Sequence, residues 1–421
     1  MKRTRTAALI AASTLIAGAA AAVPVAFATT ASAAECQGEP WDADTVYWGD
    51  DLVSHQDEEY RAQWWTRGQE PGTTGEWGVW EHLGACDGAG DDPTAEPTDE
   101  PTDEPTDEPT DEPTDAPTTG PPPGDGETTL TGYWHNFDNG STVMRLSEIP
   151  AAYDIVAVAF ADAVPSPVGA VDFTLDSDVA NQLGYTEAEF KSDIAAIQAE
   201  GRKVIISVGG EKGNVTINDA ASADAFAESV LSLMDEYGFD GVDIDLEHGI
   251  DASAIETAMR AVHAGAGSDL VYTMAPQTID FQYESAGYYQ LAVNTKDILT
   301  IVNMQYYNSG SMLGCDDQVY SQGDVDFITA QACIQLEAGL APSQVGLGLP
   351  AVASAAGSGY VDPAMVNDAL DCLTRLANCG DFTPSQAYPG IGGAMTWSVN
   401  WDATSGYHFA DTVAGHFSTL P

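Results

Sequence analysis

The chain has 421 residues, and its 65 acidic against 13 basic residues give a formal charge of −52. Fifteen of the acids lie between residues 87 and 127, and the rest of the chain still carries −37. Surfaces that bind nucleic acid or an anionic membrane need clustered Lys and Arg, so this balance disfavours both kinds of partner. A neutral polymer would be indifferent to the charge.

Residues 1–33 have the pattern of a secretory signal. Lys2, Arg3 and Arg5 form a basic start, an apolar stretch follows, and Ala31 to Ala33 offers a small-residue cleavage site. An uncleaved anchor is the alternative, but the apolar run from Ala7 to about Ala22 is short and alanine-rich for a membrane span. We therefore predict a secreted, extracellular protein.

Residues 34–86 form a small predicted module that Cys36 and Cys86 bracket. A disulfide between these cysteines would compensate for a limited core. The module is too small to bury all of its aromatic side chains, although we expect Trp77 and Trp80 to be core residues. Trp64 and Trp65 are adjacent, and alternation along a strand makes it hard to bury both. Exposed rings of this kind bind flat, apolar ligand faces.

The run YRAQWWTRGQEPG, followed by WGVWEHLGAC, resembles the chitin-binding modules of carbohydrate-binding families 5 and 12. The resemblance covers the whole small module. It implies a small all-β domain that binds insoluble chitin, with Trp64 and Trp65 as contact residues.

Residues 87–127 are a predicted linker in which the unit EPTD repeats five times, from Glu96 to Asp115. The segment has almost nothing apolar to bury and its like charges repel, so we expect it to be disordered or extended. It would tether the small module to a large one.

Residues 128–421 alternate strand-like apolar runs with amphipathic stretches. Eight buried strands alternating with helices over nearly 300 residues predict an α/β fold, a parallel (β/α)8 barrel, although a doubly wound open sheet is the alternative. The predicted strands are Leu130–Phe137, Ile155–Ala161, Lys203–Gly209, Gly241–Glu247, Leu270–Ala275, Ile298–Tyr307, Val345–Leu349 and Ala394–Val399. The clearest predicted helices are Glu187–Glu200, Ser222–Tyr237, Ala252–Ala264 and Val325–Glu337.

Four of the six cysteines fall in this large module. By proximity we expect the pairs Cys315–Cys333 and Cys372–Cys379, because an exported protein favours disulfides. No CxxC or His/Cys cluster accompanies them, so a metal site is disfavoured.

The fourth predicted strand carries an unusual set of acids. Asp243, Asp245 and Glu247 alternate with apolar residues, so all three should point into the barrel interior. Burying three carboxyl groups costs free energy unless they share protons or serve chemistry. They could bind Mg²⁺ or Ca²⁺, or neighbouring carboxylates could raise one pKa and hold a proton ready for acid catalysis. We favour acid catalysis, because no His joins the strand-end acids in metal-ligand spacing and an exported protein meets no phosphate substrate.

Five motifs follow the predicted strands: Ser207-Val208-Gly209-Gly210, DGVDIDLE at Asp240 to Glu247, Met274-Ala275-Pro276-Gln277, the run from Gln305 to Asn308, and Trp397. They lie in this order on the third, fourth, fifth, sixth and eighth predicted strands. Together they resemble glycoside hydrolase family 18, whose members are (β/α)8 barrels, and the match spans the large module.

The resemblance implies a chitinase with substrate-assisted retention, in which the 2-acetamido group of the substrate is the nucleophile. Glu247 would protonate the glycosidic oxygen, Asp245 would orient the acetamido N–H, and Asp243 would tune Asp245. Tyr307 would hydrogen-bond the acetamido carbonyl. Further substrate contacts are expected from Gln305, Asn308, Met274, Gln277 and Tyr133, with Trp397 as the apolar floor. Asp240 should support the strand.

Only residues 350–393 separate the last two predicted strands, whereas many exo-acting relatives carry an inserted α+β domain there. We therefore expect an open groove and endo-type cleavage of chitin by a monomer without cofactor or metal. The alternatives are an endo-β-N-acetylglucosaminidase acting on N-glycans and a non-catalytic chitin-binding lectin. The intact Glu247 argues against the lectin.

Overall fold

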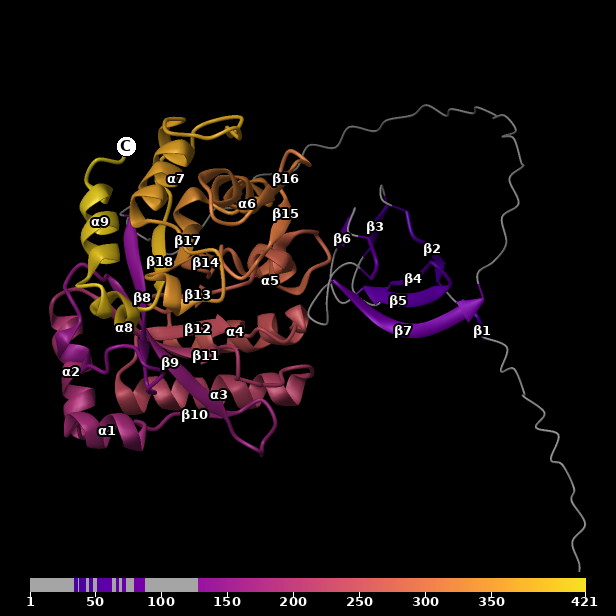
Figure 1. Cartoon of the computed structure of the whole chain (residues 1–421). Helices are drawn as coiled ribbons and strands as arrows, with labels where there is room; N and C mark the ends of the chain where they lie inside the picture. Colours follow the sequence, from indigo (N-terminus) through magenta and orange to yellow (C-terminus); the bar gives the residue numbers. More distant parts are fainter. Residues whose placement is uncertain are drawn as a thin grey trace, which may run out of the picture. The chain divides into compact units, whose positions relative to one another are not determined.

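The computed structural model describes residues 34–36, 38–42, 45–47, 51–62, 66–67, 70–72, 79–87 and 128–421 (Figure 1). The predicted signal segment and all of the predicted linker after residue 87 lie outside these residues. The chain divides into two compact units, Met1–Pro113 and Thr114–Pro421, which we take separately. In the described part of the chain, no helix has the length and apolar character needed to cross a bilayer.

The N-terminal unit is all-β, as expected. Its main sheet has the strand order β1-β7-β5-β4-β2, and a second sheet pairs β3 with β6. The predicted disulfide Cys36–Cys86 is confirmed, and Trp80 is 4% exposed in the small core, as predicted. Trp64, Trp65 and Trp77 lie outside the described residues. The strands are β1 Ala34–Glu35, β2 Glu39–Pro40, β3 Val46–Tyr47, β4 Leu52–His55, β5 Glu58–Ala62, β6 Thr66–Arg67 and β7 Trp80–Asp87.

The C-terminal unit is a closed barrel of eight parallel strands. Strand β8 pairs with both β9 and β18, which closes the sheet and rules out the open doubly wound alternative. The predicted barrel is therefore confirmed. In barrel order the strands are β8 Thr129–His135, β9 Ile155–Ala163, β11 Lys203–Gly209, β12 Gly241–Asp245, β13 Val271–Met274, β14 Ile301–Gln305, β17 Val345–Pro350 and β18 Gly393–Trp397.

Helices surround the barrel (Figure 1). The α-helices are α1 Ser177–Leu183, α2 Glu187–Ala199, α3 Ala220–Tyr237, α4 Ala252–Ala266, α5 Gly287–Thr295, α6 Val325–Glu337, α7 Pro363–Arg375, α8 Val399–Thr404 and α9 His408–Phe417. Short 3-10 turns are η1 Leu146–Glu148, η2 Thr278–Phe281, η3 Pro342–Gln344 and η4 Ala353–Ala355, and three short strands lie outside the barrel: β10 Val171–Asp172, β15 Ser311–Leu313 and β16 Val319–Ser321.

Strand alternation divides the core into two layers. On β12, Val242 and Ile244 point outward and pack in the large cluster between strands and helices. A smaller cluster fills the barrel interior with side chains such as Ile205, Val271 and Met395. Because the outward layer satisfies the hydrophobic requirement, the inward positions at the carboxyl ends of the strands are free to carry polar groups.

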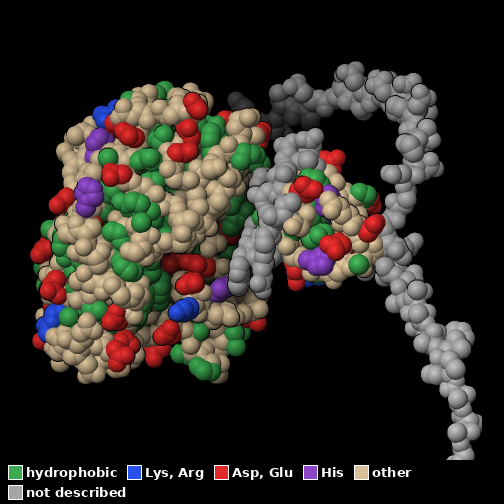
Figure 2. All heavy atoms as spheres, viewed as in Figure 1, with side chains coloured by type: hydrophobic (Ala, Val, Ile, Leu, Met, Phe, Trp, Pro, Cys, Tyr) green, Lys and Arg blue, Asp and Glu red, His purple; other side chains and the backbone are tan. Residues whose placement is uncertain are grey.

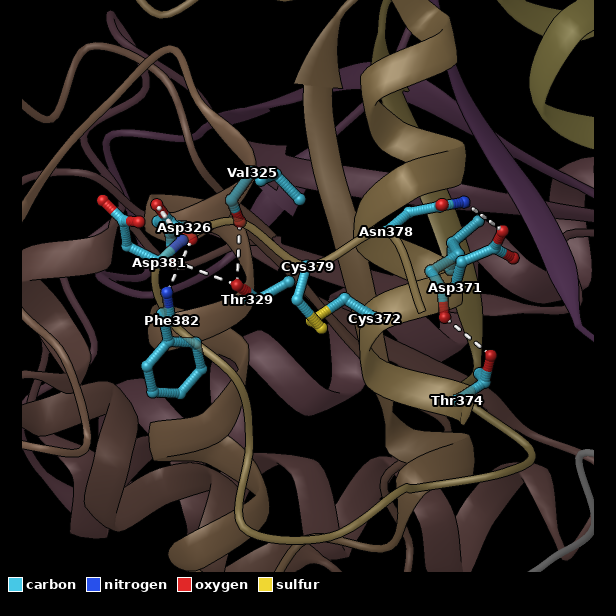
Figure 3. Close-up of a disulfide and its surroundings, with 11 residues drawn as sticks. Val325, Asp326, Thr329, Asp371, Cys372, Thr374, Asn378, Cys379, Asp381 and Phe382 are labelled. Atoms are coloured by element: carbon cyan, nitrogen blue, oxygen red, sulfur yellow. Dashed lines mark hydrogen bonds between the residues drawn. A yellow bond between two sulfur atoms is a disulfide. The ribbon is translucent and has the colours of Figure 1, made fainter. Parts of the chain in front are cut away.

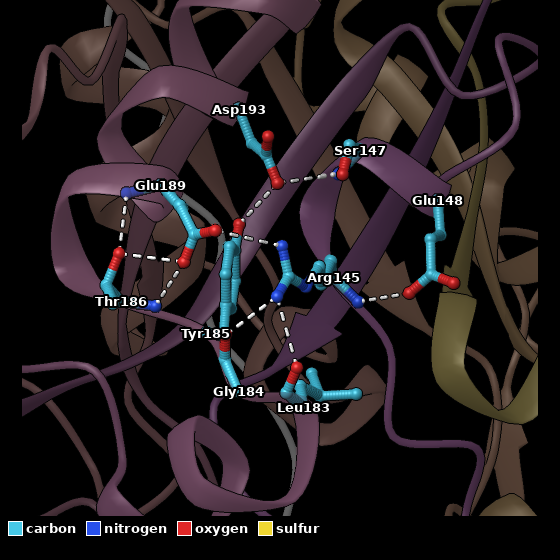
Figure 4. A network of polar contacts seen from close by, with 9 residues as sticks. All are labelled: Arg145, Ser147, Glu148, Leu183, Gly184, Tyr185, Thr186, Glu189 and Asp193. Atoms are coloured by element: carbon cyan, nitrogen blue, oxygen red, sulfur yellow. Dashed lines mark hydrogen bonds and ion pairs between the residues drawn. The ribbon is translucent and has the colours of Figure 1, made fainter.

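A polar network fastens the start of α2 to the segment after β8 (Figure 4). Thr186 caps α2 in a reciprocal box with Glu189. The guanidinium of Arg145 lies 4.8 Å from the centre of the Tyr185 ring and donates to the carbonyls of Leu183 and Gly184 at 3.1 and 2.8 Å. One cation thus satisfies carbonyls that the end of α1 leaves unpaired.

Both predicted disulfides of the large unit are confirmed. Cys315 joins Cys333 of α6, and Cys372 of α7 joins Cys379 just past that helix (Figure 3). The carboxylate of Asp326 accepts the backbone N–H groups of Asp381 and Phe382 at 3.0 and 2.9 Å. These bonds anchor the segment that leads from α7 back to β18.

Candidate active site

Three acids gather at the carboxyl end of β12. Asp243 is fully buried, Asp245 is 4% exposed, and Glu247 follows the strand in a half-buried position. In a barrel of this kind the chemistry lies at the carboxyl ends of the strands. The alternation predicted from the sequence therefore places the acids on the face where catalysis is expected.

Three hydroxyl groups hold Asp243 in the barrel interior. Tyr133 and Ser207 each donate to Oδ2 at 2.7 Å, and Thr273 donates to Oδ1 at 2.5 Å. Burial raises the pKa of Asp243, and these three hydrogen bonds oppose the rise because they favour the carboxylate. The three donors come from β8, β11 and β13, so they also fix how these strands meet around β12.

The side-chain amide of Gln305 links the next two acids. Its Nε2 donates to Asp245 Oδ1 at 2.9 Å, to Glu247 Oε1 at 3.3 Å and to the carbonyl of Ala275 at 2.9 Å. The amide is itself buried on β14. Gln305 thereby sets the distance between the two carboxyl groups and keeps both facing the same space.

Burial is the main cause of the raised pKa of both Asp245 and Glu247. The charges of Asp243 and Glu247 raise the pKa of Asp245 further, well above its usual range, and its bond to Gln305 lowers it. The pKa of Glu247 is lowered by Gln305 and raised by Glu211. The site therefore keeps protons on carboxyl groups at a higher pH than free side chains would.

Two glycines of the motif Ser207-Val208-Gly209-Gly210 make room for this arrangement. A Cβ on Gly209, whose φ is +124°, would lie 2.1 Å from the carbonyl oxygen of Asp245. A Cβ on Gly210 would lie 2.6 Å from the Phe160 ring. A side chain at either position would displace the acid strand or the aromatic wall, which explains the pair in physical terms.

Aromatic side chains line one wall of the site. Trp397, at the end of β18, is half-buried, and its ring centre lies 5.9 Å from that of Phe160 in a stacked arrangement. The ring centres of Tyr133 and His135 lie 5.5 and 4.7 Å from that of Trp397. Burial lowers the pKa of His135 to about 3, so its ring is neutral at ordinary pH. The wall is thus an uncharged, apolar surface suited to a sugar face.

Tyr307 and Asn308 follow β14 next to Gln305. Tyr307 is 8% exposed, and burial followed by the charge of Asp245 raises its pKa well above the usual range, so its hydroxyl keeps its proton. Asn308 is exposed, and its Oδ1 accepts the backbone N–H of Ser358 at 3.0 Å, which fastens the loop after β17. A contact between Asn308 and a sugar stays a prediction.

The three other residues expected to contact substrate, Gln277, Tyr133 and Met274, differ in their burial and in the direction of their side chains. Gln277 is half-buried and bridges to Gln305 through the backbone, which brings it to the rim of the site. Tyr133 is 1% exposed, and its hydroxyl is engaged by Asp243. Met274 is fully buried in the layer between strands and helices, because its position on β13 points outward, so we assign it to the core.

Asp240 supports the strand, as expected: its Oδ2 accepts the backbone N–H of Val204 at 2.8 Å, and the Lys203 ammonium lies 3.1 Å from Oδ1.

Two polar residues of the site were not predicted. Thr273 has no motif to mark it, and its role emerges only from its register with Asp243. Asp280, in η2, accepts the N–H of Gln277 at 3.1 Å. Burial chiefly raises the pKa of Asp280 to about 6, and the charge of Glu247 adds to the rise.

Metal-ligating groups gather at one place in the described part of the chain, where Cys315, Cys333 and Glu337 lie within 4.8 Å of one another. The two cysteines form a disulfide, which leaves them unable to act as thiolate ligands. The acids of β12 do not form such a group.

Comparisons with known proteins agree with this geometry. Residues 129–419 match the family described as glycosyl hydrolases family 18, and residues 40–81 match carbohydrate-binding module family 5/12. The chain therefore belongs to glycosyl hydrolase family 18, with a family 5/12 binding module before the barrel. The family resemblance predicted from the motifs is confirmed.

Named relatives have similar sequences. Chitinase Chi52 of Paenibacillus xylanexedens is 37% identical in an alignment of 327 positions that covers 69% of this chain and 61% of the relative. Exochitinase 1 of Streptomyces olivaceoviridis is 36% identical in an alignment of 334 positions that covers 68% of this chain and 55% of the relative. The chain thus matches less than two thirds of the length of these relatives.

Solved structures are similar as well. A crystal structure of a candidate Chitinase A from Streptomyces coelicolor is 61% identical, with a TM-score of 0.69, and the match covers 70% of this chain and all of that one. A family GH18 chitinase from Chromobacterium violaceum is 31% identical, with a TM-score of 0.65, and the match covers 91% of this chain and all of that one.

Proposed function

We propose that this protein is a secreted chitinase that hydrolyses the β-1,4 links of N-acetylglucosamine polymers with retention. The observation that carries the proposal is the Gln305 amide, which holds Asp245 and Glu247 facing the same space beside Tyr307. An acid, an orienting carboxylate and a neutral phenol are the groups that substrate-assisted cleavage needs. The names of the relatives support chitin as the substrate.

In the first step, Glu247 gives its proton to the glycosidic oxygen while the bond from that oxygen to C1 breaks. The carbonyl oxygen of the substrate's own 2-acetamido group attacks C1 and closes an oxazolinium ring. Asp245 accepts the acetamido N–H and offsets the positive charge of the ring. Tyr307 donates its hydroxyl proton in a hydrogen bond to the acetamido oxygen, which aims that oxygen at C1.

In the second step, the Glu247 carboxylate removes a proton from water, and the hydroxide adds to C1 from the side that the leaving group vacated. The oxazolinium ring opens and the acetamido group is restored. Two inversions give net retention. Asp243, with its three hydroxyl donors, keeps a negative charge or a shared proton behind Asp245, and the two groups titrate as a coupled pair.

We further propose endo-type cleavage in an open groove. Between β17 and β18, residues 351–392 contain η4 and α7 and no strand, so the inserted α+β domain expected of many exo-acting enzymes is absent from this connection. One relative bears the name exochitinase and others the name endochitinase, so the names leave the mode of attack to experiment. Release of short products only from the chain ends of intact chitin would contradict endo cleavage.

The binding module is proposed to hold the enzyme on insoluble chitin through Trp64 and Trp65. The double change Trp64→Ala, Trp65→Ala should weaken binding to insoluble chitin in a pull-down assay and leave hydrolysis of short soluble oligomers nearly unchanged. A large loss of activity on soluble oligomers would refute the proposal that the two tryptophans serve only to bind insoluble chitin.

The described surface is strongly acidic, with few basic side chains on the visible face of the larger unit (Figure 2), which suits a neutral polymer better than an anionic one.

The Glu247→Gln variant tests the catalytic assignment. Gln has nearly the same shape but no acidic proton to give, so hydrolysis of colloidal chitin should fall by at least about 100-fold, the usual contribution of general acid catalysis. The variant should still bind chitin oligomers. Wild-type turnover by Glu247→Gln would refute the assignment, and activity on N-glycans but not on chitin would favour an endo-β-N-acetylglucosaminidase.

A further inference from the structure

The loop after β17 lies directly on the Tyr307 backbone. Gly359 in this loop has a φ of +84°, and a Cβ there would come within 2.7 Å of the Tyr307 Cα and 3.0 Å of its Cβ. Such an approach admits only glycine, both for space and for backbone conformation. The next residue, Tyr360, is therefore placed beside the part of the site that is proposed to hold the acetamido sugar.

Hydrogen bonds fasten this loop without using the Tyr360 ring. The backbone N–H of Asn308 donates to the carbonyl of Ser358 at 3.2 Å, and the Ser358 N–H donates to Asn308 Oδ1 at 3.0 Å. Gln322 donates to the Ser358 hydroxyl at 2.8 Å and accepts the N–H of Ser309 at 2.7 Å. These bonds fix the loop at Ser358, immediately before Gly359, and the Tyr360 ring takes part in none of them.

The Tyr360 side chain is 37% exposed, which makes it one of the few large apolar side chains on the surface of the described residues. The loop that carries it follows the carboxyl end of a barrel strand, where substrates bind. An exposed aromatic ring on a loop that hydrogen bonds hold in place offers the surface that the apolar face of a pyranose ring prefers.

We propose that Tyr360 is a stacking platform for a pyranose ring of the substrate chain, next to the sugar that Tyr307 contacts. The ligand class is an uncharged N-acetylglucosamine unit, so this inference rests on the proposed function. Tyr360 would act by binding and would take no part in proton transfer. Its removal should raise KM for chains long enough to reach it and leave kcat unchanged.

The test measures affinity separately from hydrolysis. Titration calorimetry in the Glu247→Gln background gives the Kd for a chitin oligomer series from dimer to hexamer, with and without Tyr360→Ala. We expect Tyr360→Ala to weaken binding of the longer oligomers by about 3- to 10-fold, the range of one aromatic contact. The dimer should be affected least. Tyr360→Phe should restore the affinity, because stacking needs the ring and not the hydroxyl.

The matched control is Leu376→Ala, which removes an equally exposed apolar side chain, 42% exposed, from the end of α7 at the opposite end of the barrel. It should leave every Kd unchanged. The proposal is overturned if Tyr360→Ala binds the long oligomers as tightly as its parent, or if Tyr360→Phe is as weak as Tyr360→Ala. A wild-type enzyme that hydrolyses no chitin oligomer would refute the proposed function instead.

Discussion

The hydroxyl of Tyr133, on the first barrel strand, donates a 2.7 Å hydrogen bond to Asp243 on the fourth. A buried carboxylate needs such donors, because leaving it unpaired costs the full desolvation penalty. Ser207 and Thr273 complete the set. Asp243 therefore belongs to the site and also links four strands of the barrel. Removing one of its donors at a time tests how much each hydrogen bond contributes to stability and to catalysis.

Thr273→Val removes one donor to Asp243 at nearly constant volume. It should lower the free energy of unfolding by about 1–3 kcal/mol and lower kcat, because Asp243 is left under-satisfied behind Asp245. The control is Thr131→Val on β8, whose buried hydroxyl finds no partner among the described residues. The control should be neutral or stabilising in a thermal melt. Equal losses for both variants would show that Thr273 acts only through packing.

Asp245→Asn tests the cost of burying charge. The pKa of Asp245 is raised by burial and by its acidic neighbours, so folding takes up a proton and wild-type stability falls as pH rises through the folded pKa. The Asn variant lacks this loss. Its Tm should match wild type near pH 4 and exceed it by a few degrees near pH 8, while its activity drops at least about 100-fold. A Tm difference that is constant over pH would contradict the account.

Glu211→Gln tests how a neighbouring carboxyl tunes the proton donor Glu247. Burial chiefly raises the pKa of Glu247, and the charge of Glu211 adds to the rise. Gln keeps the size of the side chain but removes the charge. The alkaline limb of kcat/KM should therefore move to lower pH, since Glu247 loses its proton earlier. Asp269→Asn, just before β13, is the control and should leave the profile in place; an unmoved or higher limb for Glu211→Gln would contradict the coupling.

Much of the fold follows from the sequence because buried parallel strands are long apolar runs between amphipathic segments. The predicted strand Lys203–Gly209 and helix Val325–Glu337 agree with the structure at both ends. Predicted ends are least accurate where polar site residues extend the apolar pattern, as at Gly241–Glu247, where the strand ends at Asp245. Period-two alternation on that strand still placed Asp243 and Asp245 correctly in the interior.

The site was less predictable where a role depends on register between strands. Nothing local marks Thr273, because its partner lies 30 residues away on β12. The outward position of Met274 follows from the alternation on β13, which the motif alone does not reveal. Asn308 and Gly359 hold the loop after β17 against the end of β14, a contact between segments about 50 residues apart in the sequence. Such pairings are set by the closed barrel and become visible only with it.

The central claim is that Glu247 supplies the proton and the substrate supplies the nucleophile. The most direct measurement compares the initial rate of hydrolysis of an N-acetylglucosamine hexamer with that of the fully deacetylated hexamer, at equal concentration and with the same chain length. The account predicts rapid cleavage of the acetylated chain and almost none of the amine form, because Asp245 and Tyr307 then have no acetamido group to aim. Comparable rates on the two hexamers would contradict it.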